Sequence, residues 1–253
     1  MSTASAEFWA QLPLGRNVRL LTRDDQGVAA LAKPAGALSH PNTPKDQPRA
    51  LLTCAYDEKR ECFVWPAAGG VESRLWLLNR LDSATSGVIL VAAGEGLAAA
   101  IKAQFARRQV HKVYEALVFG KPRLPDEIWR DRLTIEKRGG AIRTGAAGNI
   151  PAESHFSLLR TRAGQPPLAL VRLEPKTGRS HQLRVQCARR RLPIVGDQTY
   201  GDFRLNREFV RATGFKRLFL HSMETRFEYE WAGRKAGFSA AAPLPEEFTA
   251  VLG

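Results

Sequence analysis

The chain has 253 residues, 44% of them hydrophobic and 25% charged, so it can bury a sizeable core and has the composition of a globular protein. No apolar run approaches the length of a membrane-spanning helix, and three cysteines (Cys54, Cys62 and Cys187) offer neither a disulfide framework nor metal-site spacing. The formal net charge of +13 favours a polyanionic partner, most commonly nucleic acid, but also fits a basic protein without a special partner.

We expect a single domain over residues 1–253, with residues 1–27 as an N-terminal extension and no separate RNA-binding module before the main domain. The first residues lack the basic start and apolar core of a signal peptide. The sparse cysteines suit reduced thiols, so the cytoplasm is the expected compartment.

The first expected strand covers residues 28–32, an apolar run that leads into Lys33-Pro34-Ala35-Gly36. Proline and glycine predict a turn there, and the chain then continues as a loop through His40-Pro41. Residues 51–56 fit one face of a short helix.

Residues 78–92 are the most informative stretch. Their second half is an apolar, β-branched run that predicts a buried strand. Their first half ends in Asp82, followed by small polar residues and Gly87, which predicts a tight loop entering that strand. A carboxylate on a short loop at the edge of a sheet is well placed for chemistry, but Asp in this context also commonly forms a simple Asx turn.

Two regular elements are expected next. Apolar residues at helical spacing predict a helix over residues 97–108. Residues 111–120 read as a strand, and its alternation places Tyr114 with Lys112 and Ala116 on one face.

Core patterning stops over residues 121–150, which we interpret as an insertion. Prolines and glycines accumulate there together with the basic residues Arg130, Arg132, Lys137, Arg138 and Arg143. Two interpretations remain open: a solvated, flexible excursion, or a basic hairpin arm that grips RNA backbone.

The last third of the chain predicts a hairpin of strands 154–160 and 168–174, and then a helix beginning near Ser180 as its N-cap. Arg179 stands at the entrance of that helix, where an anion would suit it, and Arg184 lies one turn in. A late strand over 218–222 and a terminal helix within 243–252 complete the pattern.

Several of these segments together resemble the RluA-type pseudouridine synthases. The signature is Arg80-Leu81-Asp82-x-x-Thr-Ser-Gly before an apolar strand, with Asn79 where the family usually has His. Further landmarks follow in the family's order over residues 28–222: Lys-Pro-x-Gly with a later His-Pro, Lys-x-Tyr-x-Ala, Thr-Gly-Arg-Ser-His-Gln-Leu-Arg, and Pro-Ile-x-Gly-Asp-x-x-Tyr-Gly. One short motif arises easily by chance, but several in the family's order do not.

The resemblance implies an α+β fold: a central mixed, largely antiparallel bent sheet with flanking helices and a cleft. It implies an RNA pseudouridine synthase, an isomerase that needs no metal and no cofactor, acting on a ribosomal or transfer RNA stem-loop, and we expect a monomer. Within it, Asp82 would be the essential carboxylate, as nucleophile or as base. Arg184 would pair with it, and Tyr114 would stack on the flipped base and relay a proton.

The resemblance also implies substrate-binding roles, which we assign to Arg80, Lys33, Thr85, Lys112, Arg179 and Gln182. Besides Asn79, Gln186 replaces a frequent family His. A catalytically silent RNA-binding protein on the same fold is the main alternative. A carboxylate glycosidase is a third, but that chemistry usually needs two acids and has no use for the basic charge.

Overall fold

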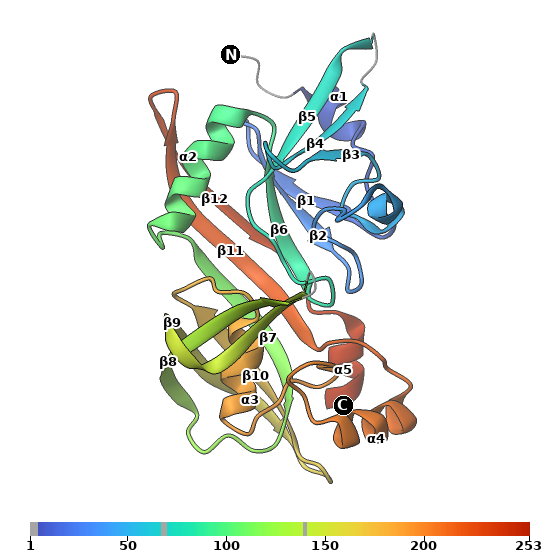
Figure 1. Ribbon diagram of the computed structural model, residues 1–253, viewed down its shortest axis with the longest axis vertical. Helices are drawn as coiled ribbons and strands as arrows, with labels where there is room; N and C mark the ends of the chain where they lie inside the picture. The colour runs from blue at the N-terminus through green and yellow to red at the C-terminus, as the bar shows by residue number, and fades with distance from the viewer. Residues whose placement is uncertain (1–4, 67–69, 139–140) are drawn as a thin grey trace. The chain divides into compact units, whose positions relative to one another are not determined.

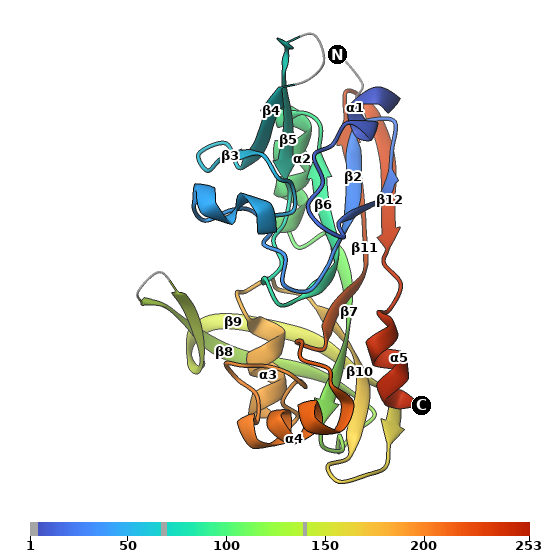
Figure 2. The same ribbon diagram turned by 90° about the vertical axis from the view of Figure 1, so that its right-hand side faces the viewer.

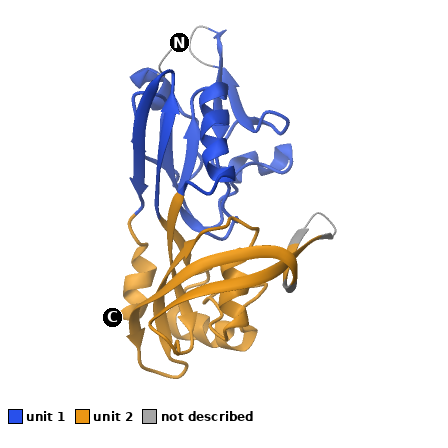
Figure 3. Ribbon diagram, turned by 90° about the vertical axis from the view of Figure 1, so that its left-hand side faces the viewer, with its two compact units in different colours: residues 1–110, 224–242 blue, residues 111–223, 243–253 orange. Residues whose placement is uncertain are grey.

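The computed structural model describes residues 5–66, 70–138 and 141–253. It divides into two compact units, which Figure 3 shows in different colours. Unit 1 comprises residues 1–110 and 224–242, and unit 2 comprises residues 111–223 and 243–253. Because both units combine strands with helices, the expected α+β class is confirmed.

Unit 1 contains mostly strands (Figure 1). Its elements are α1 (Ala6–Ala10), β1 (Arg19–Arg23), β2 (Val28–Lys33), the 3-10 helix η1 (Pro44–Arg49), β3 (Ala55–Asp57), β4 (Cys62–Pro66), β5 (Glu72–Leu77), β6 (Ser86–Ala92), α2 (Glu95–Ala106), most of β11 (Leu220–Trp231) and β12 (Arg234–Ala241).

Strand β6 is the centre of unit 1, and each of its seven residues is buried. It pairs antiparallel with β2 from Val28 opposite Ala92 to Lys33 opposite Gly87, and β1 pairs with the other edge of β2. The strands expected at residues 28–32 and after Asp82 are thus confirmed. The continuous apolar run of β6 reflects burial on both faces.

Helix α2 begins at Glu95 and ends at Ala106, two residues earlier at each end than expected. Arg108 adopts a left-handed conformation with φ of 60°, which cannot continue the helix. Leu97, Ala98 and Ile101 are buried in the same apolar cluster as residues of β6, β11 and β12. The apolar face read from the sequence is therefore the buried face.

The short helix expected over residues 51–56 is wrong. Backbone hydrogen bonds hold this segment extended: Gly15 N–H donates to Leu51 O at 2.9 Å, and Leu51 N–H donates to Leu38 O at 2.8 Å. Leu51 and Leu52 are both fully buried, so these neighbouring side chains occupy the core without helical spacing.

Unit 2 contains β7 (His111–Phe119), β8 (Asp126–Arg138), β9 (Ala141–Arg162), β10 (Leu168–Pro175), α3 (Gln182–Arg189), α4 (Phe203–Thr213), α5 (Glu246–Leu252) and the start of β11. Strand β10 pairs antiparallel with β7 on one side and β9 on the other, and β9 pairs with β8. The expected 154–160/168–174 hairpin, the strand from His111 and the terminal helix are confirmed.

The described residues within 121–150 include two paired strands, and whether this segment grips RNA stays a prediction. Strand β8 pairs with β9 from Asp126 opposite Ser157 to Arg138 opposite Ala141, and the hairpin projects from the rest of unit 2 (Figure 2). Strand β9 continues without a break to Arg162, so the predicted boundary at residue 150 does not separate two elements. We call β8 with its paired part of β9 the arm. The side chains of Lys137 and Arg138 lie outside the described part of the chain.

A row of ionisable side chains crosses four neighbouring strands of unit 2. His155 Nε2 lies 2.9 Å from Asp126 Oδ2, and His155 Nδ1 lies 3.4 Å from Glu174 Oε1. His111 Nε2 lies 3.2 Å from the other oxygen of Glu174. The hydrogen bond to Asp126 is the main cause that raises the pKa of His155, with Glu174 adding to it.

This row predicts a pH-dependent contribution to stability. A raised histidine pKa in the folded protein stabilises it fully below the ordinary value of about 6.5, and this gain is lost as the pH rises through the folded pKa. We expect His155→Gln to lower Tm more at pH 5.5 than at pH 9. Thermal unfolding of both proteins at the two values measures this, and an equal or larger loss at pH 9 would contradict the assignment.

Within the described residues, no helix is long and apolar enough to cross a membrane.

Candidate active site

The loop that carries Asp82 is held at several backbone points in unit 1. Ser39 Oγ brackets Leu81: it accepts a hydrogen bond from Leu81 N–H at 3.0 Å and donates one to Leu81 O at 2.7 Å. Thr85 N–H donates to Asp82 O at 3.0 Å, which closes the turn. Asp82 itself is half-buried, at the entrance of the fully buried strand β6. A rigid frame thus presents its carboxylate.

Asn79 fixes the same loop from the other end. Its Oδ1 accepts a hydrogen bond from Leu90 N–H at 2.8 Å, in the middle of β6. The residue that departs from the family's usual histidine therefore contributes a loop hydrogen bond, as expected for an amide.

Lys33 lies beneath the Asp82 loop rather than on a surface. Its side chain is 1% exposed, and Nζ donates to Pro34 O at 3.1 Å, Ala37 O at 2.6 Å and Ser83 O at 3.0 Å. The ammonium group is thus engaged by backbone carbonyls, one of them next to Asp82, instead of being presented to a phosphate. Thr85 is also buried, whereas Arg80 is exposed beside the loop.

Tyr114 and Lys112 lie on one face of β7 in unit 2, as the alternation predicts. Tyr114 is half-buried and stands opposite Leu173 of β10. Lys112 points to the loop before α3, since a Cβ added to Gly178 would lie 3.4 Å from Lys112 Nζ. Burial lowers the pKa of the Lys112 ammonium group.

Helix α3 begins later than expected. Its N-cap is His181, in a left-handed conformation with φ of 55°, and not Ser180. Ser180 O instead accepts a hydrogen bond from Thr144 Oγ1 of the arm at 2.8 Å. The sequence favours Ser180 because a serine oxygen can cap a helix, but the left-handed backbone of His181 places the first helical residue at Gln182.

Arg184, one turn into α3, is held by the carboxylate of Asp197, which lies in the Pro-Ile-x-Gly-Asp segment. Arg184 Nε donates to Asp197 Oδ2 and Nη2 donates to Asp197 Oδ1, both at 2.7 Å. Both side chains are buried, at 9% and 1% exposure. This two-bond geometry fixes the plane of the guanidinium group.

The electrostatics of Asp197 agree with this pairing. Burial disfavours its charge, but hydrogen bonds from Arg184 and from the backbone N–H groups of Tyr200 and Thr199 outweigh burial and hold its pKa below the ordinary value. The turn itself requires Gly196, whose φ is 77° and where an added Cβ would meet Arg217 O at 1.7 Å.

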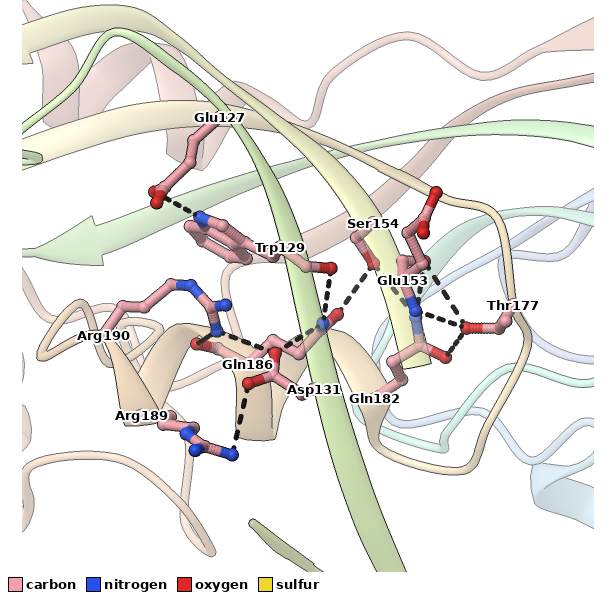
Figure 4. A network of polar contacts seen from close by, with 10 residues as sticks. All are labelled: Glu127, Trp129, Asp131, Glu153, Ser154, Thr177, Gln182, Gln186, Arg189 and Arg190. Carbon is pink, nitrogen blue, oxygen red and sulfur yellow. Dashed lines mark hydrogen bonds and ion pairs between the residues drawn. The ribbon is translucent and has the colours of Figure 1, made fainter. Parts of the chain in front are cut away.

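Gln182 is buried and has all its hydrogen-bonding groups engaged inside unit 2 (Figure 4). Its Oε1 accepts from Thr177 Oγ1 and Arg179 N–H, and its Nε2 donates to Glu153 O and Ser154 Oγ. It therefore ties the loop before α3 to β9 and is not presented to a ligand.

Gln186, the second departure from the family pattern, extends this network. Ser154 Oγ donates to Gln186 Oε1 at 2.7 Å, and Gln186 Nε2 donates to Asp131 Oδ2 at 2.8 Å. Asp131 Oδ2 also accepts a hydrogen bond from Arg190 Nη1 at 2.9 Å. Figure 4 shows these contacts between α3 and β8. A glutamine donates and accepts at once, which suits this fully buried position.

The predicted site residues therefore fall into two groups. Unit 1 brings together Lys33, Arg80, Asp82 and Thr85 on one loop system, and unit 2 brings together Lys112, Tyr114, Arg179, Gln182 and Arg184 around β7 and the start of α3. The pairing of Asp82 with Arg184 remains a prediction. Among the described residues, no three His, Cys, Asp or Glu side chains are arranged to hold a metal ion.

Comparisons with known proteins agree with the resemblance in the sequence. A family model described as RNA pseudouridylate synthase matches residues 27–189. The chain is 31% identical over 230 residues to tRNA pseudouridine synthase C of Yersinia pestis, covering 85% of this chain and 83% of that protein. It is 29% identical over 233 residues to ribosomal large subunit pseudouridine synthase C of Vibrio vulnificus, covering 92% of this chain and 68% of that protein.

A solved structure, human RNA pseudouridylate synthase domain containing 1, superposes with a TM-score of 0.64 over 100% of this chain and 97% of that chain, at 21% sequence identity. At this identity the likeness supports the fold alone.

Proposed function

Because the chain belongs to the RNA pseudouridylate synthase family and thus isomerises uridine to pseudouridine in RNA, we propose that its target is a uridine in transfer RNA. The observation that carries this choice is the likeness to proteins named tRNA pseudouridine synthase C, two of which are 31% and 30% identical with more than four fifths of their length covered. A ribosomal target is the second candidate, since one relative carries a ribosomal name.

Incubation of the purified protein with unmodified transfer RNA and, separately, with fragments of large-subunit ribosomal RNA tests the target. Mapping of pseudouridine after each reaction identifies the modified position. We expect one transfer RNA uridine to be converted at low enzyme concentration. Conversion of a ribosomal uridine alone would assign the second candidate.

We propose Asp82 as the catalytic carboxylate. The reaction breaks the bond between uracil N1 and the ribose C1′, rotates the base and forms the bond between C5 and C1′. C5 then loses a proton and N1 gains one, so that the product is an isomer of uridine. Asp82 would act on the sugar or the base, and its support is the frame around it: Ser39, Thr85 and Lys33 all fix the backbone next to it. Such preorganisation lowers the cost of placing a reacting group.

Tyr114 and Arg184 complete the proposed chemistry. Tyr114 would stack on the flipped base and carry the C5 proton away, which its half-buried place on a rigid strand supports. Arg184 would supply positive charge to the catalytic carboxylate. The two hydrogen bonds that Arg184 donates to Asp197 fix the orientation of its guanidinium group, which supports this role.

We propose that four cations near these groups bind RNA phosphates: exposed Arg80 beside the Asp82 loop, half-buried Arg179 before α3, and exposed Arg132 and Arg143 on the arm. Lys112 is proposed to face the substrate from β7. Lys33, Thr85 and Gln182 are given positioning roles instead, because their side chains are buried. The enzyme is proposed to act as a monomer in the cytoplasm, in keeping with its three free cysteines.

The positioning role of Lys33 gives a specific prediction. Lys33→Met removes the donor of Ala37 O and one of the two donors of Pro34 O and Ser83 O, which keep the N–H groups of Ala37 and Gly36. We expect a loss of about 1–3 kcal/mol in the free energy of unfolding and slower pseudouridine formation at saturating RNA, with RNA affinity unchanged. Urea unfolding, single-turnover kinetics and filter binding measure the three quantities. If Lys33→Met instead binds RNA more weakly and unfolds like wild type, Lys33 binds phosphate and the positioning role is wrong.

A further inference from the structure

Tyr200 stands where three parts of unit 2 meet, and the proposed reaction does not assign it a role. Its hydroxyl accepts a hydrogen bond from Thr144 N–H of the arm at 2.9 Å. The same hydroxyl lies 2.9 Å from Nδ1 of His181, the N-cap of α3. A phenol can accept one hydrogen bond and donate another, so one oxygen serves both partners.

The ring of Tyr200 contacts the proposed catalytic arginine. The Arg184 guanidinium carbon lies 5.1 Å from the ring centroid, in the geometry of a cation–π contact. The backbone N–H of Tyr200 also donates to Asp197 Oδ1 at 3.0 Å, the oxygen that receives Arg184 Nη2. Two separate contacts thus make the position of Tyr200 and that of Arg184 interdependent.

The arm is joined to α3 by a second bond next to the first. Thr144 is 4% exposed, and its Oγ1 donates to Ser180 O at 2.8 Å. Tyr200 also packs against a small apolar cluster of Leu133 on β8, Ala152 on β9 and Val185 on α3. The middle of the arm and the start of α3 therefore share one buried junction.

We infer that Tyr200 is a positioning residue that couples engagement of the arm by RNA to the orientation of Arg184. This inference rests on the proposed roles of the arm and of Arg184. Exposed Arg143 adjoins Thr144 in β9, so a phosphate held by Arg143 restrains the strand whose next N–H bonds Tyr200. In this way, binding of RNA outside the reacting uridine helps to orient Arg184 for the reaction.

The test is a double-mutant cycle on Arg143→Ala and Tyr200→Phe. Tyr200→Phe keeps the ring under Arg184 but removes the hydroxyl shared by Thr144 and His181. We expect it to lower the single-turnover rate constant at saturating RNA by about fivefold or more, because a buried N–H loses its acceptor, while RNA affinity changes by less than about twofold. This split separates positioning from binding.

Arg143→Ala is expected to weaken RNA binding in both backgrounds. It should lower the saturating rate constant only where the Tyr200 hydroxyl is present. The matched control is Arg162→Ala, which removes another exposed arginine of β9 beyond the paired arm. In the double variant with Tyr200→Phe, the decrease in the saturating rate constant should lie within about twofold of the product of the two single-variant decreases. Equal effects of Arg143→Ala on the rate constant in both backgrounds, or no effect in either, would overturn the coupling.

His181→Asn supplies a second variant should Tyr200→Phe unfold at the assay temperature. Asparagine tolerates the left-handed backbone at this position and removes the ring that faces the hydroxyl. It should reproduce the loss of rate with normal RNA affinity, and an unchanged rate constant would count against the inference. Wild-type activity and the Asp82→Asn variant report on the proposed function itself, so failure of the coupling and failure of the chemistry give different results.

Discussion

Asp82→Asn is expected to reduce pseudouridine formation by at least about 10³-fold, the scale of loss when a residue in direct contact with reacting atoms is removed. Asparagine keeps the size of the side chain and leaves the loop bonds through Leu81 and Thr85 in place. RNA affinity should therefore stay within about threefold of wild type. Single-turnover conversion of labelled RNA and filter binding measure the two quantities.

The matched control is Ser83→Ala in the same loop. Ser83 is exposed, and its backbone carbonyl accepts hydrogen bonds from Lys33 Nζ and Gly36 N–H, which the substitution leaves in place. We expect near-normal conversion. Asp82→Asn with more than a tenth of wild-type activity would remove Asp82 from the chemistry and leave it as an Asx-turn residue.

Asp197→Asn is expected to give the largest loss of stability. It breaks a buried ion pair in which Arg184 donates two hydrogen bonds, and breaking such a pair costs about 3–5 kcal/mol in other proteins. Glu208→Gln is the control, because it breaks the exposed Arg204–Glu208 pair, and such pairs contribute about 0.3–0.5 kcal/mol. Urea unfolding of the three proteins at pH 7 measures both losses.

The pH dependence of this loss has a definite sign. Since the pKa of Asp197 is held below its ordinary value, its contribution is present above about pH 4 and is lost as the pH falls through the folded pKa. The difference between wild type and Asp197→Asn should shrink below pH 4. A loss under 1 kcal/mol at pH 7, or one that grows in acid, would show that the pair does not stabilise the fold.

Much of the fold could be predicted from local pattern. The apolar run of β6, the alternation of β7 and the helical spacing in α2 each reflect a face that is buried in the structure. Prediction failed where buried side chains do not recur at helical or strand spacing. Leu51 and Leu52 are adjacent and both buried, and no helix forms there. Helix α4 was missed although Asp202 caps it and Gly214 ends it.

The candidate site was predicted less evenly. Motif order predicts Asp82, Tyr114 and Arg184 as catalytic residues, but spacing cannot tell whether a lysine or glutamine faces a ligand or the backbone. Lys33 and Gln182 face the backbone because residues distant in sequence, Ser83 and Ser154, provide their partners. Asp197 received no role from the sequence for the same reason, since its pairing with Arg184 depends on how the turn packs against α3. These contacts are tertiary and leave no local signal.

The central claim is that this chain converts uridine to pseudouridine in RNA with Asp82 as the catalytic carboxylate. The most direct measurement maps pseudouridine in transfer and ribosomal RNA from cells that lack the gene and carry either the wild-type chain or Asp82→Asn. We expect a uridine that loses its modification without the gene and regains it only with the wild-type chain. Restoration of that site by Asp82→Asn, or an RNA profile that does not respond to the gene, would contradict it.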